Sequence, residues 1–421
     1  MTLHDPHPQQ PELQWSDPEA EKNQEALRAQ IALDTQKKLD EQNLWKNLDN
    51  IQNATLGFDK VFAINLASRT DKRDNIVLGS SVTGFVVDLV DGVDPEGMNP
   101  KSYPYNWNYD HSESEYACRR AHVNMAERIV EKRMNSALIL EDDVDWDISI
   151  KAQLQNLALA TRALQGTAPD STSSPYGHDW DLLWLGHCGM SCKVKEPYYM
   201  TPQDPTVVKP HHLPLYFYGI PEYNKTDDSR LTCTVFDSTC MTAYALSYKG
   251  AQKILAALSV NPSGIADEVD TGDQIDIVLG RMCKAGTLRC FAPFPSLMGR
   301  YQSAGMSSKG TDQLGKEAGS HMVPASSVGV VYSTMLNIKR ILKGLRTVHA
   351  TWPDVKAQDI LPEDIHIGVG DIHPPVVPSE PISTPVDAKL PDLEPLEGLE
   401  AANKPDSAVA PIPYETPVSK L

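Results

Sequence analysis

A short apolar run, residues 137–140, leads directly into Glu141, Asp142, Asp143 and Asp145. Such a run predicts a buried strand of a parallel sheet, and ligands of open α/β sheets bind beyond the carboxyl ends of such strands. Carboxylates this close raise one another's pKa unless a cation lies between them. Hard oxygen ligands favour Mg²⁺ or Mn²⁺. The pattern therefore predicts a divalent metal site, and a solvated acidic turn is the alternative.

The segments around this cluster alternate between strand and helix patterns, which predicts an α/β fold with a largely parallel sheet. We expect strands at residues 60–66, 84–90, 179–186 and 243–247, and helices at residues 113–134 and 249–258. A further helix should begin near Ser68 or Thr70, either of which could cap it. Residues 190–231, rich in Pro, Tyr and His, are expected to form an inserted loop over the site. Such a loop could determine which acceptor substrate the site recognises.

Charge and hydropathy exclude some classes of protein. The chain has 421 residues and a formal charge of −18, from 56 acidic and 38 basic residues. Since an acidic chain repels phosphates, we expect no general binding to nucleic acid. No run of about 18 apolar residues is present, so we expect no transmembrane segment. The polar start, residues 1–15, lacks the apolar core of a signal peptide, and taken literally the chain is cytoplasmic.

Cysteines and glycosylation motifs point instead to an oxidising compartment. Six of the seven cysteines fall into close pairs that suit disulfides, namely Cys188/Cys192, Cys233/Cys240 and Cys283/Cys290, leaving Cys118. Asn53-Ala-Thr and Asn224-Lys-Thr have the form of glycosylation acceptors. A zinc site formed by His187, Cys188 and Cys192 is the alternative for the first pair.

Composition divides the chain into three parts. Residues 1–57 are expected to form a polar N-terminal arm that is partly helical, with a solvated arm as the alternative. Residues 58–350 form the globular body. Eleven prolines lie between Pro374 and Pro417. Residues 351–421 are therefore expected to form a disordered Pro-rich tail that buries too little apolar surface to become ordered.

Five segments of the globular body carry motifs in a fixed order. They are residues 61–69 with Arg73, the Asp-Gly of residues 91–94, Cys118 to His122, the Leu-Ile-Leu-Glu-Asp-Asp-Val block of residues 138–144, and the Ala-Tyr-Ala-Leu-Ser-x-x-Gly-Ala block from residue 243. Together they resemble glycosyltransferase family 25, which includes bacterial lipooligosaccharide galactosyltransferases and animal collagen galactosyltransferases. The sequence departs from the family pattern at Ala121, where Ser is usual, and at Arg73, which stands without an adjacent arginine.

The resemblance implies a GT-A type fold, in which one Rossmann-like catalytic domain binds a nucleotide sugar together with Mn²⁺ or Mg²⁺. The metal would offset the negative charge that develops on the diphosphate when the sugar–phosphate bond breaks. We expect Asp143 to be the first metal ligand and Glu141 the second, because strand alternation places both on one face. Asp142, on the opposite face, could contact the ribose.

The nucleotide is expected just beyond the first strand, near Asn65 and Arg69. The planar guanidinium of Arg69 suits a diphosphate, and Arg73 follows one turn later; a solvated helix start is the alternative for both. Asp91 could bind uridine or ribose, or could only form an Asp-Gly turn. His122 could orient a phosphate, although a buried histidine with satisfied hydrogen bonds is favoured.

Transfer also needs a base that takes the acceptor hydroxyl proton. Asp273 and Asp276 are the candidates, because Asp273-Gln-Ile-Asp276 resembles the late acidic segment of the family. Ordinary helix capping by Asp270, Thr271 or Asp273 is the alternative.

Two functions are consistent with these patterns. The first is metal-dependent transfer of a hexose, with galactose favoured, from a UDP-sugar to a glycan or hydroxylated acceptor. The second is a non-catalytic relative that binds a glycan or a partner protein. Retention of three adjacent acids favours the enzyme. The family, the paired cysteines and the two acceptor motifs together suggest the lumen of the Golgi or endoplasmic reticulum.

Overall fold

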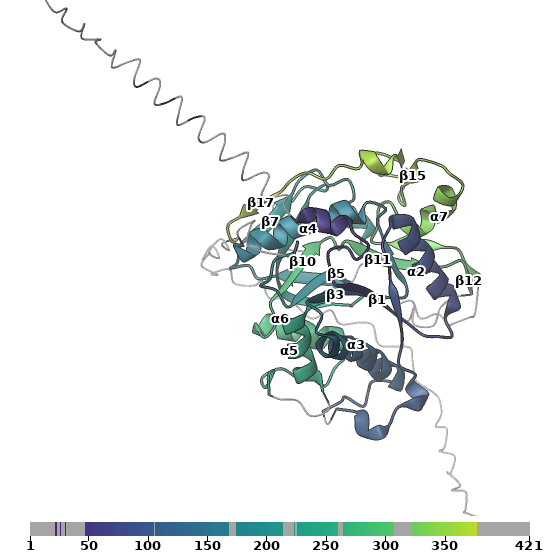
Figure 1. The fold of residues 1–421 in the computed structure, drawn as a ribbon, viewed down its shortest axis with the longest axis vertical. Coiled ribbons are helices and arrows are strands. Elements are labelled where there is room, and N and C mark those ends of the chain that lie inside the picture. Colours follow the sequence, from purple (N-terminus) through teal and green to yellow (C-terminus); the bar gives the residue numbers. More distant parts are fainter. Residues whose placement is uncertain are drawn as a thin grey trace, which may run out of the picture. The chain divides into compact units, whose positions relative to one another are not determined.

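The chain folds into three layers, with a mixed β-sheet between two groups of helices (Figure 1). The structure is a computed structural model that describes residues 22, 26, 30, 47–104, 106–167, 174–213, 223, 225–259, 264–306 and 322–376. Its α-helices within residues 47–376 are α2 (Thr70–Thr83), α3 (Glu113–Lys132), α4 (Ile150–Gln165), α5 (Tyr248–Leu258), α6 (Ile275–Ala285) and α7 (Thr334–Leu342). Side chains of α2, α4 and α7 join one core, and those of α3, α5 and α6 join the other.

The sheet runs in the order β17-β7-β8-β10-β5-β9-β3-β1-β2, with β6 paired to β8. Its strands are β1 (Lys60–Asn65), β2 (Asp88–Asp91), β3 (Ser136–Glu141), β5 (Leu182–Gly186), β6 (Gly189–Cys192), β7 (Tyr198–Thr201), β8 (Arg230–Thr239), β9 (Ala243–Ser247), β10 (Cys290–Phe294) and β17 (Asp371–His373). β1 pairs in parallel with β2 and β3, and β5 pairs in parallel with β10. The other pairs are antiparallel.

The α/β class is therefore confirmed, but the expectation of a largely parallel sheet is wrong. The parallel group lies around β1, whereas β9 lies antiparallel between β3 and β5. β6, β7 and β8 follow one another without an α-helix between them in the described residues. Parallel strands need a long crossover, so strands joined without one pair antiparallel.

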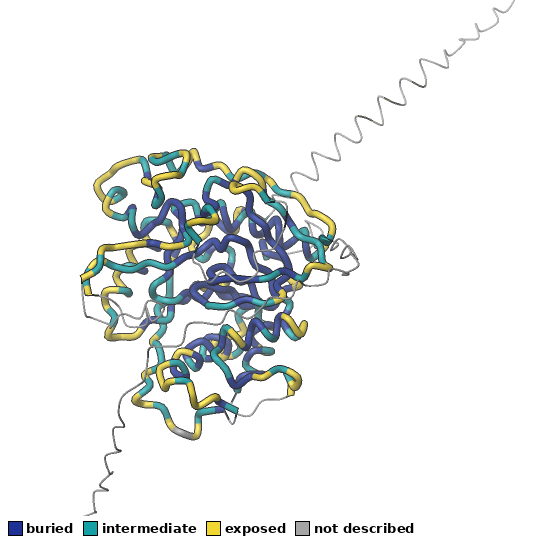
Figure 2. Tube along the Cα trace, turned by 180° about the vertical axis from the view of Figure 1, so that it is seen from behind, coloured by how far each residue is buried: buried dark blue, intermediate teal, exposed yellow. Residues whose placement is uncertain are grey.

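The apolar run before the acidic cluster forms the central strand β3, as predicted. Because side chains alternate along a strand, Ala137 and Ile139 join the core with α3, α5 and α6, while Leu138 and Leu140 join the opposite core. All four are completely buried. Figure 2 shows the central strands as the deeply buried part of the fold. Burial on both faces explains why this strand is continuously apolar.

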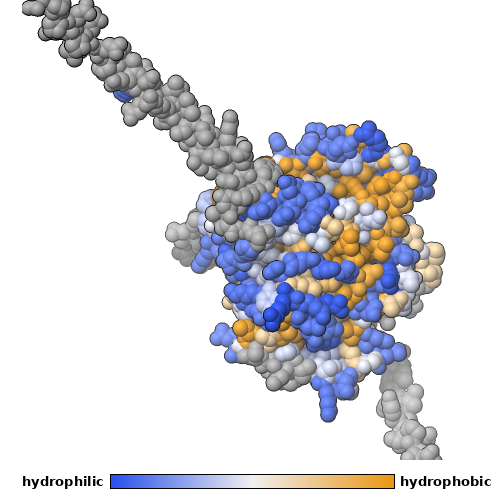
Figure 3. All heavy atoms as spheres, in the orientation of Figure 1, coloured by the Kyte–Doolittle hydropathy of each residue, from blue (hydrophilic) through white to orange (hydrophobic). Residues whose placement is uncertain are grey.

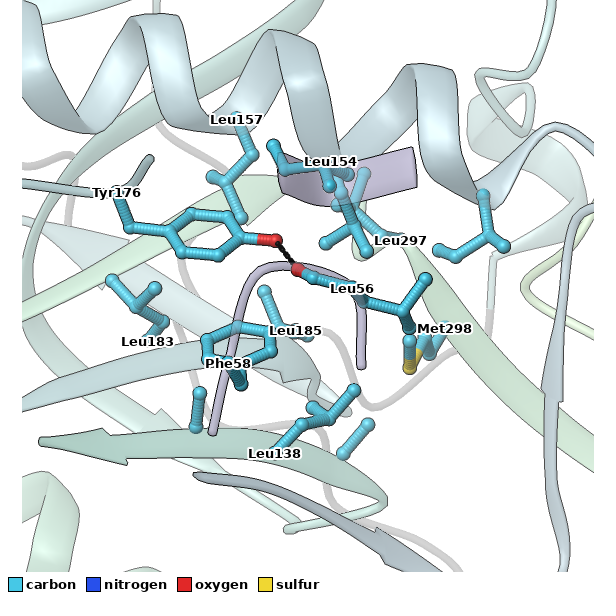
Figure 4. Packing of buried hydrophobic residues seen from close by; sticks show 14 of the residues in the cluster. Leu56, Phe58, Leu138, Leu154, Leu157, Tyr176, Leu183, Leu185, Leu297 and Met298 are labelled. Atoms are coloured by element: carbon cyan, nitrogen blue, oxygen red, sulfur yellow. Dashed lines mark hydrogen bonds between the residues drawn. The ribbon is translucent and has the colours of Figure 1, made fainter. Parts of the chain in front are cut away.

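The segment before Phe58 belongs to the folded body, so the domain boundary expected after residue 57 is too late. A short 3₁₀ helix, η1 (Leu48–Gln52), places Leu48 and Ile51 in the core. The Tyr176 hydroxyl donates to the Leu56 carbonyl oxygen at 2.7 Å, as Figure 4 shows. Phe58 stacks on Tyr176 with 4.5 Å between ring centroids. The rest of the predicted arm lies outside the described residues, apart from three exposed helical positions.

Residues 351–376 also belong to the body, so the tail expected from residue 351 begins too early. β17 pairs with β7, and β16 (Asp359–Ile360) pairs with β15 (Val348–His349). Val208 and Ile365 belong to a small apolar cluster, whose other buried members precede or follow α7 in the chain. The compact unit ends at Val377, and residues 377–421 lie outside the described residues.

The region expected to form an inserted loop instead extends the sheet in its described part. It supplies β6, β7 and the start of β8, which lie toward the β17 edge and away from β1. Arg230, at the start of β8, forms a buried ion pair with Asp204 at 2.7 Å. The expected position over the site is therefore wrong for this part of the chain.

Three disulfides join Cys188 to Cys240, Cys192 to Cys233, and Cys283 to Cys290. Only the last pair matches the expectation from close spacing. Residues four apart in an extended strand are about 13 Å apart, farther than a disulfide reaches. β6 lies antiparallel to β8, and this pairing brings cysteines from opposite strands together. The zinc alternative is wrong, because Cys188 and Cys192 are both oxidised.

The visible surface is mostly hydrophilic, with apolar area along the side where Figure 1 draws α2 and α7 (Figure 3). Val77 and Leu78 of α2 and Leu342 of α7 are among the exposed large apolar side chains. No helix within the described residues has the length and apolar character that crossing a bilayer requires.

Candidate functional site

The acidic cluster lies where the large sheet passes into a smaller one. β3 ends at Glu141, and β4 (Val144–Trp146) belongs to a three-stranded sheet with β11 (Met298–Gln302) and β14 (Ser326–Val328). Asp142 and Asp143 form the turn between the two sheets, at the carboxyl end of β3. Because the chain leaves the extended conformation after Glu141, strand alternation does not determine where these two side chains point.

Asp142 and Asp143 share one cation, Lys72 of α2. Its Nζ lies 2.5 Å from Asp142 Oδ1 and 3.8 Å from Asp143 Oδ2. Asn65, the last residue of β1, donates from Nδ2 to Asp142 Oδ2 at 3.0 Å and to the Arg69 carbonyl oxygen at 3.1 Å. These contacts tie the ends of β1 and β3 to the start of α2.

Asp143 is also held from the smaller sheet. Arg300 of β11 lies 3.2 Å from Asp143 Oδ2, and the Tyr301 backbone N–H donates to the Asp143 carbonyl oxygen at 2.6 Å. Burial opposes ionisation of Asp143, but Lys72 and Arg300 outweigh it and lower the pKa of this carboxyl. For Asp142, burial outweighs Lys72 and raises the pKa. Asp143 is therefore the more readily ionised carboxylate of the turn.

Glu141 points away from the turn, toward α3. Its Oε1 lies 3.6 Å from His122 Nε2, and His122 Nδ1 shares a hydrogen bond with the Tyr244 hydroxyl at 3.0 Å. Although burial opposes the charged ring, the Tyr244 hydroxyl and the Glu141 carboxylate raise the pKa of His122 well above its usual value. This placement matches the buried-histidine alternative. The expectation that Glu141 and Asp143 share a face is wrong, because Asp143 pairs with Asp142 around Lys72.

Asp145, the last acid of the cluster, is a structural residue. It has no exposed surface, and it accepts hydrogen bonds from the Ser327 hydroxyl at 2.6 Å and the Trp146 backbone N–H at 2.8 Å. The Ser333 hydroxyl is a further donor. These contacts join β4 to β14 and to the start of α7.

The arginines of the first motif lie at the start of α2. The Arg69 guanidinium donates two hydrogen bonds to Asp71, at 2.9 and 2.7 Å, which raises the Arg69 pKa. Arg73 is exposed one turn later. Arg69 is itself the N-cap of α2 and makes no side-chain cap, so the expected capping by Ser68 or Thr70 is wrong.

Asp91 ends β2 beside the first strand. It pairs in register with Asn65, and the following Gly92 N–H donates to the Asn65 carbonyl oxygen at 2.9 Å. The Asp91 side chain is exposed. The structure therefore brings Asn65, Arg69, Asp91 and Asp142 to one edge of the parallel strands.

The two candidate bases lie around the start of α6. Asp273 lies 3.1 Å from His111 Nε2 and 2.7 Å from Arg281, and these partners lower its pKa despite partial burial. Asp276 accepts hydrogen bonds from the Thr239 hydroxyl at 2.9 Å and the Cys240 N–H at 2.8 Å. Asp273 does not cap α6, whose N-cap is Gln274, so that alternative is wrong.

The sequence profile of glycosyltransferase family 25 (LPS biosynthesis protein) matches residues 58–269, about half of the 421-residue chain. The chain belongs to glycosyltransferase family 25. The matched residues include the strand β3, the Asp142–Asp143 turn and the start of α2. The suspected family is thereby confirmed.

The relatives of this chain include proteins named as enzymes and proteins named as inactive or probably inactive. The chain is 24% identical over 230 residues to procollagen galactosyltransferase 1 of Danio rerio, covering 52% of this chain and 32% of the relative. It is 24% identical over 228 residues to procollagen galactosyltransferase 2 of Homo sapiens, covering 51% of this chain and 30% of the relative. It is 25% identical over 215 residues to inactive glycosyltransferase 25 family member 3 of Homo sapiens, covering 48% of this chain and 29% of the relative. The chain thus spans about a third of the length of these relatives.

One family motif serves the fold rather than the site. Ser247 caps α5, with its side chain accepting from the Gly250 N–H at 3.0 Å. Gly250 packs so closely on the Asp181 backbone that a Cβ would collide with it. The Ser-x-x-Gly-Ala block of glycosyltransferase family 25 therefore fixes how α5 starts against β5.

Sequence reasoning missed Lys72 and Arg300, the two cations of the turn. Lys72 gave one usable signal, because it lies in the same helix start as Arg69 and Arg73. Nothing in the sequence indicates the role of Arg300, because it lies 157 positions from Asp143 and reaches it only through the pairing of β11 with β4.

Proposed function

We propose that this protein is a metal-dependent galactosyltransferase with a GT-A type domain, which transfers the sugar of a UDP-sugar to a glycan or a hydroxylated protein side chain. The observation that carries the proposal is the turn beyond β3, where Asp142 and Asp143 meet Lys72 and Arg300. Ligands of open α/β sheets bind at this edge. The names of the relatives favour galactose as the sugar and a protein such as procollagen as the acceptor.

The donor set of the turn fits Mn²⁺ or Mg²⁺ held jointly with a diphosphate. Mg²⁺ is usually bound through one or two carboxylates together with substrate phosphates. Asp143, with its lowered pKa, would be the direct ligand, and Asp142 lies next to it around Lys72. Glu141 is assigned to His122 instead. The bound ion would act as a Lewis acid on the departing diphosphate.

Charges of the chain itself would hold the phosphates. Lys72 and Arg300 contact the carboxylates of the turn, and a diphosphate arriving there would meet both cations. Asn65 would orient Asp142 toward the nucleotide. For the base we propose Asp273 or Asp276, the two acids around the start of α6.

We further propose a secretory-pathway compartment. The three disulfides favour an oxidising lumen over the cytoplasm. Asn53 of the first acceptor motif is exposed, although its side-chain oxygen accepts from the Thr55 and Gly57 backbone N–H groups. Asn224 of the second motif lies outside the described residues.

A non-catalytic relative is the competing function, and two observations favour it. One relative is named inactive and another probably inactive. Lys72 and Arg300 also satisfy the acids of the turn as ion pairs without any metal. In that case the protein would bind a glycan or a partner protein through the same fold.

Mn²⁺-dependent stabilisation by UDP separates the two functions. A ligand that binds only the folded state stabilises it by about 2.7 kcal/mol at one hundred times its Kd. For the enzyme we expect UDP to raise the melting temperature with Mn²⁺ and much less with EDTA. Release of sugar from UDP-, GDP- and CMP-sugars, measured with Mn²⁺, then identifies the donor. No shift and no donor turnover would favour the non-catalytic relative.

Arg69→Ala tests the diphosphate side of the proposed donor site. We expect UDP and UDP-sugar to bind about 1.5–3 kcal/mol more weakly, the value of a charge-assisted hydrogen bond. Arg69→Lys should recover only part of this, since Lys cannot form a two-pronged pair. The comparison is a calorimetric titration of UDP with Mn²⁺ into all three proteins. Equal affinities would show that Arg69 serves only its ion pair with Asp71.

A further inference from the structure

Two histidines and an aspartate meet on the surface where the C-terminal segment crosses the connection between β7 and β8. His211 and His212 belong to the short 3₁₀ helix η4 (Pro210–His212). His211 Nε2 lies 3.0 Å from Asp354 Oδ2, and His212 Nε2 lies 2.6 Å from Asp354 Oδ1. One ligand atom from each residue lies within 4.8 Å of the others. Each oxygen of one carboxylate therefore faces its own imidazole.

We propose that His211, His212 and Asp354 bind a divalent transition-metal ion of the zinc class, which ties residues 351–376 to the rest of the folded body. This site is separate from the carboxylates beyond β3, and it does not depend on the proposed transferase activity.

The geometry needs little change to accept the ion. Ligand atoms about 2.0–2.1 Å from a tetrahedral zinc are about 3.3 Å apart, close to the nitrogen–oxygen distances at Asp354. The imidazole nitrogens that approach the carboxylate are the atoms that would bind the ion. On binding, the hydrogen that each of these nitrogens carries would move to Nδ1 of the same ring, so that a neutral imidazole would hold the ion through Nε2. Two imidazoles and one carboxylate leave a fourth position for water.

The ligands are held in place before the ion arrives. The His212 ring stacks on Trp352 with 4.3 Å between centroids and 10° between planes, and its side chain is 19% exposed. His211 packs against His212 with 4.1 Å between centroids. The Asp354 carboxylate is ionised at neutral pH, as aspartates ordinarily are, and is therefore available as a ligand.

Lys209 works against a cation here. Its Nζ lies 3.1 Å from Asp354 Oδ2 and 2.6 Å from the Asp354 carbonyl oxygen. The ammonium can keep the carbonyl oxygen while the ion takes the carboxylate. Imidazole ligands suit zinc, nickel and copper, whereas Mg²⁺ and Ca²⁺ prefer oxygen. We therefore expect Zn²⁺ to bind here and Mg²⁺ not to.

The test is a calorimetric titration of Zn²⁺ into the full chain without a histidine tag, repeated with Co²⁺ to follow its absorption spectrum. We expect one site, whose Zn²⁺ affinity falls at least about tenfold in His212→Ala and in His211→Ala. Even the mutation of a residue that only hydrogen-bonds to a metal ligand lowers metal affinity by this much. Lys209→Met should bind Zn²⁺ at least as tightly as the parent, because it removes a competing positive charge.

Two matched variants control for other zinc ligands. His349 and Asp359, 3.4 Å apart, form a similar pair without a second imidazole. His349→Ala should therefore leave the Zn²⁺ affinity unchanged. Cys118 clusters with His122 and Glu141, so Cys118→Ser reports binding there. Equal affinity in His212→Ala and the parent, or loss of the site in Cys118→Ser alone, would overturn the proposal. Melting temperatures in EDTA show whether each variant remains folded.

Discussion

Asp143→Asn is expected to lower the rate of sugar transfer by about 10²–10³, the usual cost of removing one electrostatic contact to a transition state. The proposed metal would lose its direct carboxylate ligand. Lys72 and Arg300 would also lose the carboxylate that they share. UDP binding should lose most of its dependence on Mn²⁺, since Asp142 is already paired with Lys72 and Asn65, and Glu141 faces His122.

The matched control is Glu141→Gln, which changes the neighbouring acid by the same chemistry. Because Glu141 faces His122 and not the turn, we expect this variant to keep the Mn²⁺ affinity that Asp143→Asn loses. Calorimetry of UDP with Mn²⁺ and initial rates of transfer measure the two effects. Near-parental turnover by Asp143→Asn would disprove the metal role. Equal loss of Mn²⁺ affinity in both variants would instead restore Glu141 as a ligand.

The sequence predicted those features that depend on neighbouring residues. The apolar run before Glu141 identified β3, and residues 243–247 were placed as β9 without error. Helices α3 and α5 begin and end within two residues of their expected bounds. The Asp142–Asp143 turn was also placed correctly at the end of a buried strand. In each case, hydrophobic periodicity and a cap residue act over a few positions.

Features that depend on distant residues were missed. Cys188 and Cys192 were paired with each other because the register of β6 against β8 cannot be read from spacing. Arg300 reaches Asp143 only after β11 pairs with β4. The face of Glu141 was misassigned because the chain turns one residue after it. Tertiary pairing decides each of these cases, and a single sequence records it only indirectly.

The body of the protein is expected to tolerate loss of residues 378–421 but not loss of residues 351–421. Residues 378–421 are Pro-rich and have few apolar side chains to bury, so we expect the shorter deletion to leave the stability of the body unchanged. The longer deletion removes β17 from the edge of β7, and it removes the hydrogen bond from Asn156 Nδ2 to the Gly368 carbonyl oxygen at 2.8 Å. It also uncovers Val208, which packs in a cluster with Ile365.

Each large apolar side chain that loses its buried environment costs about 1.5–3 kcal/mol, and an exposed strand edge invites association between chains. We therefore expect the longer deletion to cost several kcal/mol, on the scale of the whole stability of a domain. Thermal unfolding and size-exclusion chromatography of the two truncated proteins measure this. The shorter one should match the parent, and the longer one should melt far lower or aggregate. Equal melting of all three proteins would mean that residues 351–376 lie on the body without stabilising it, and a large loss in the shorter one would extend the folded unit beyond Val377.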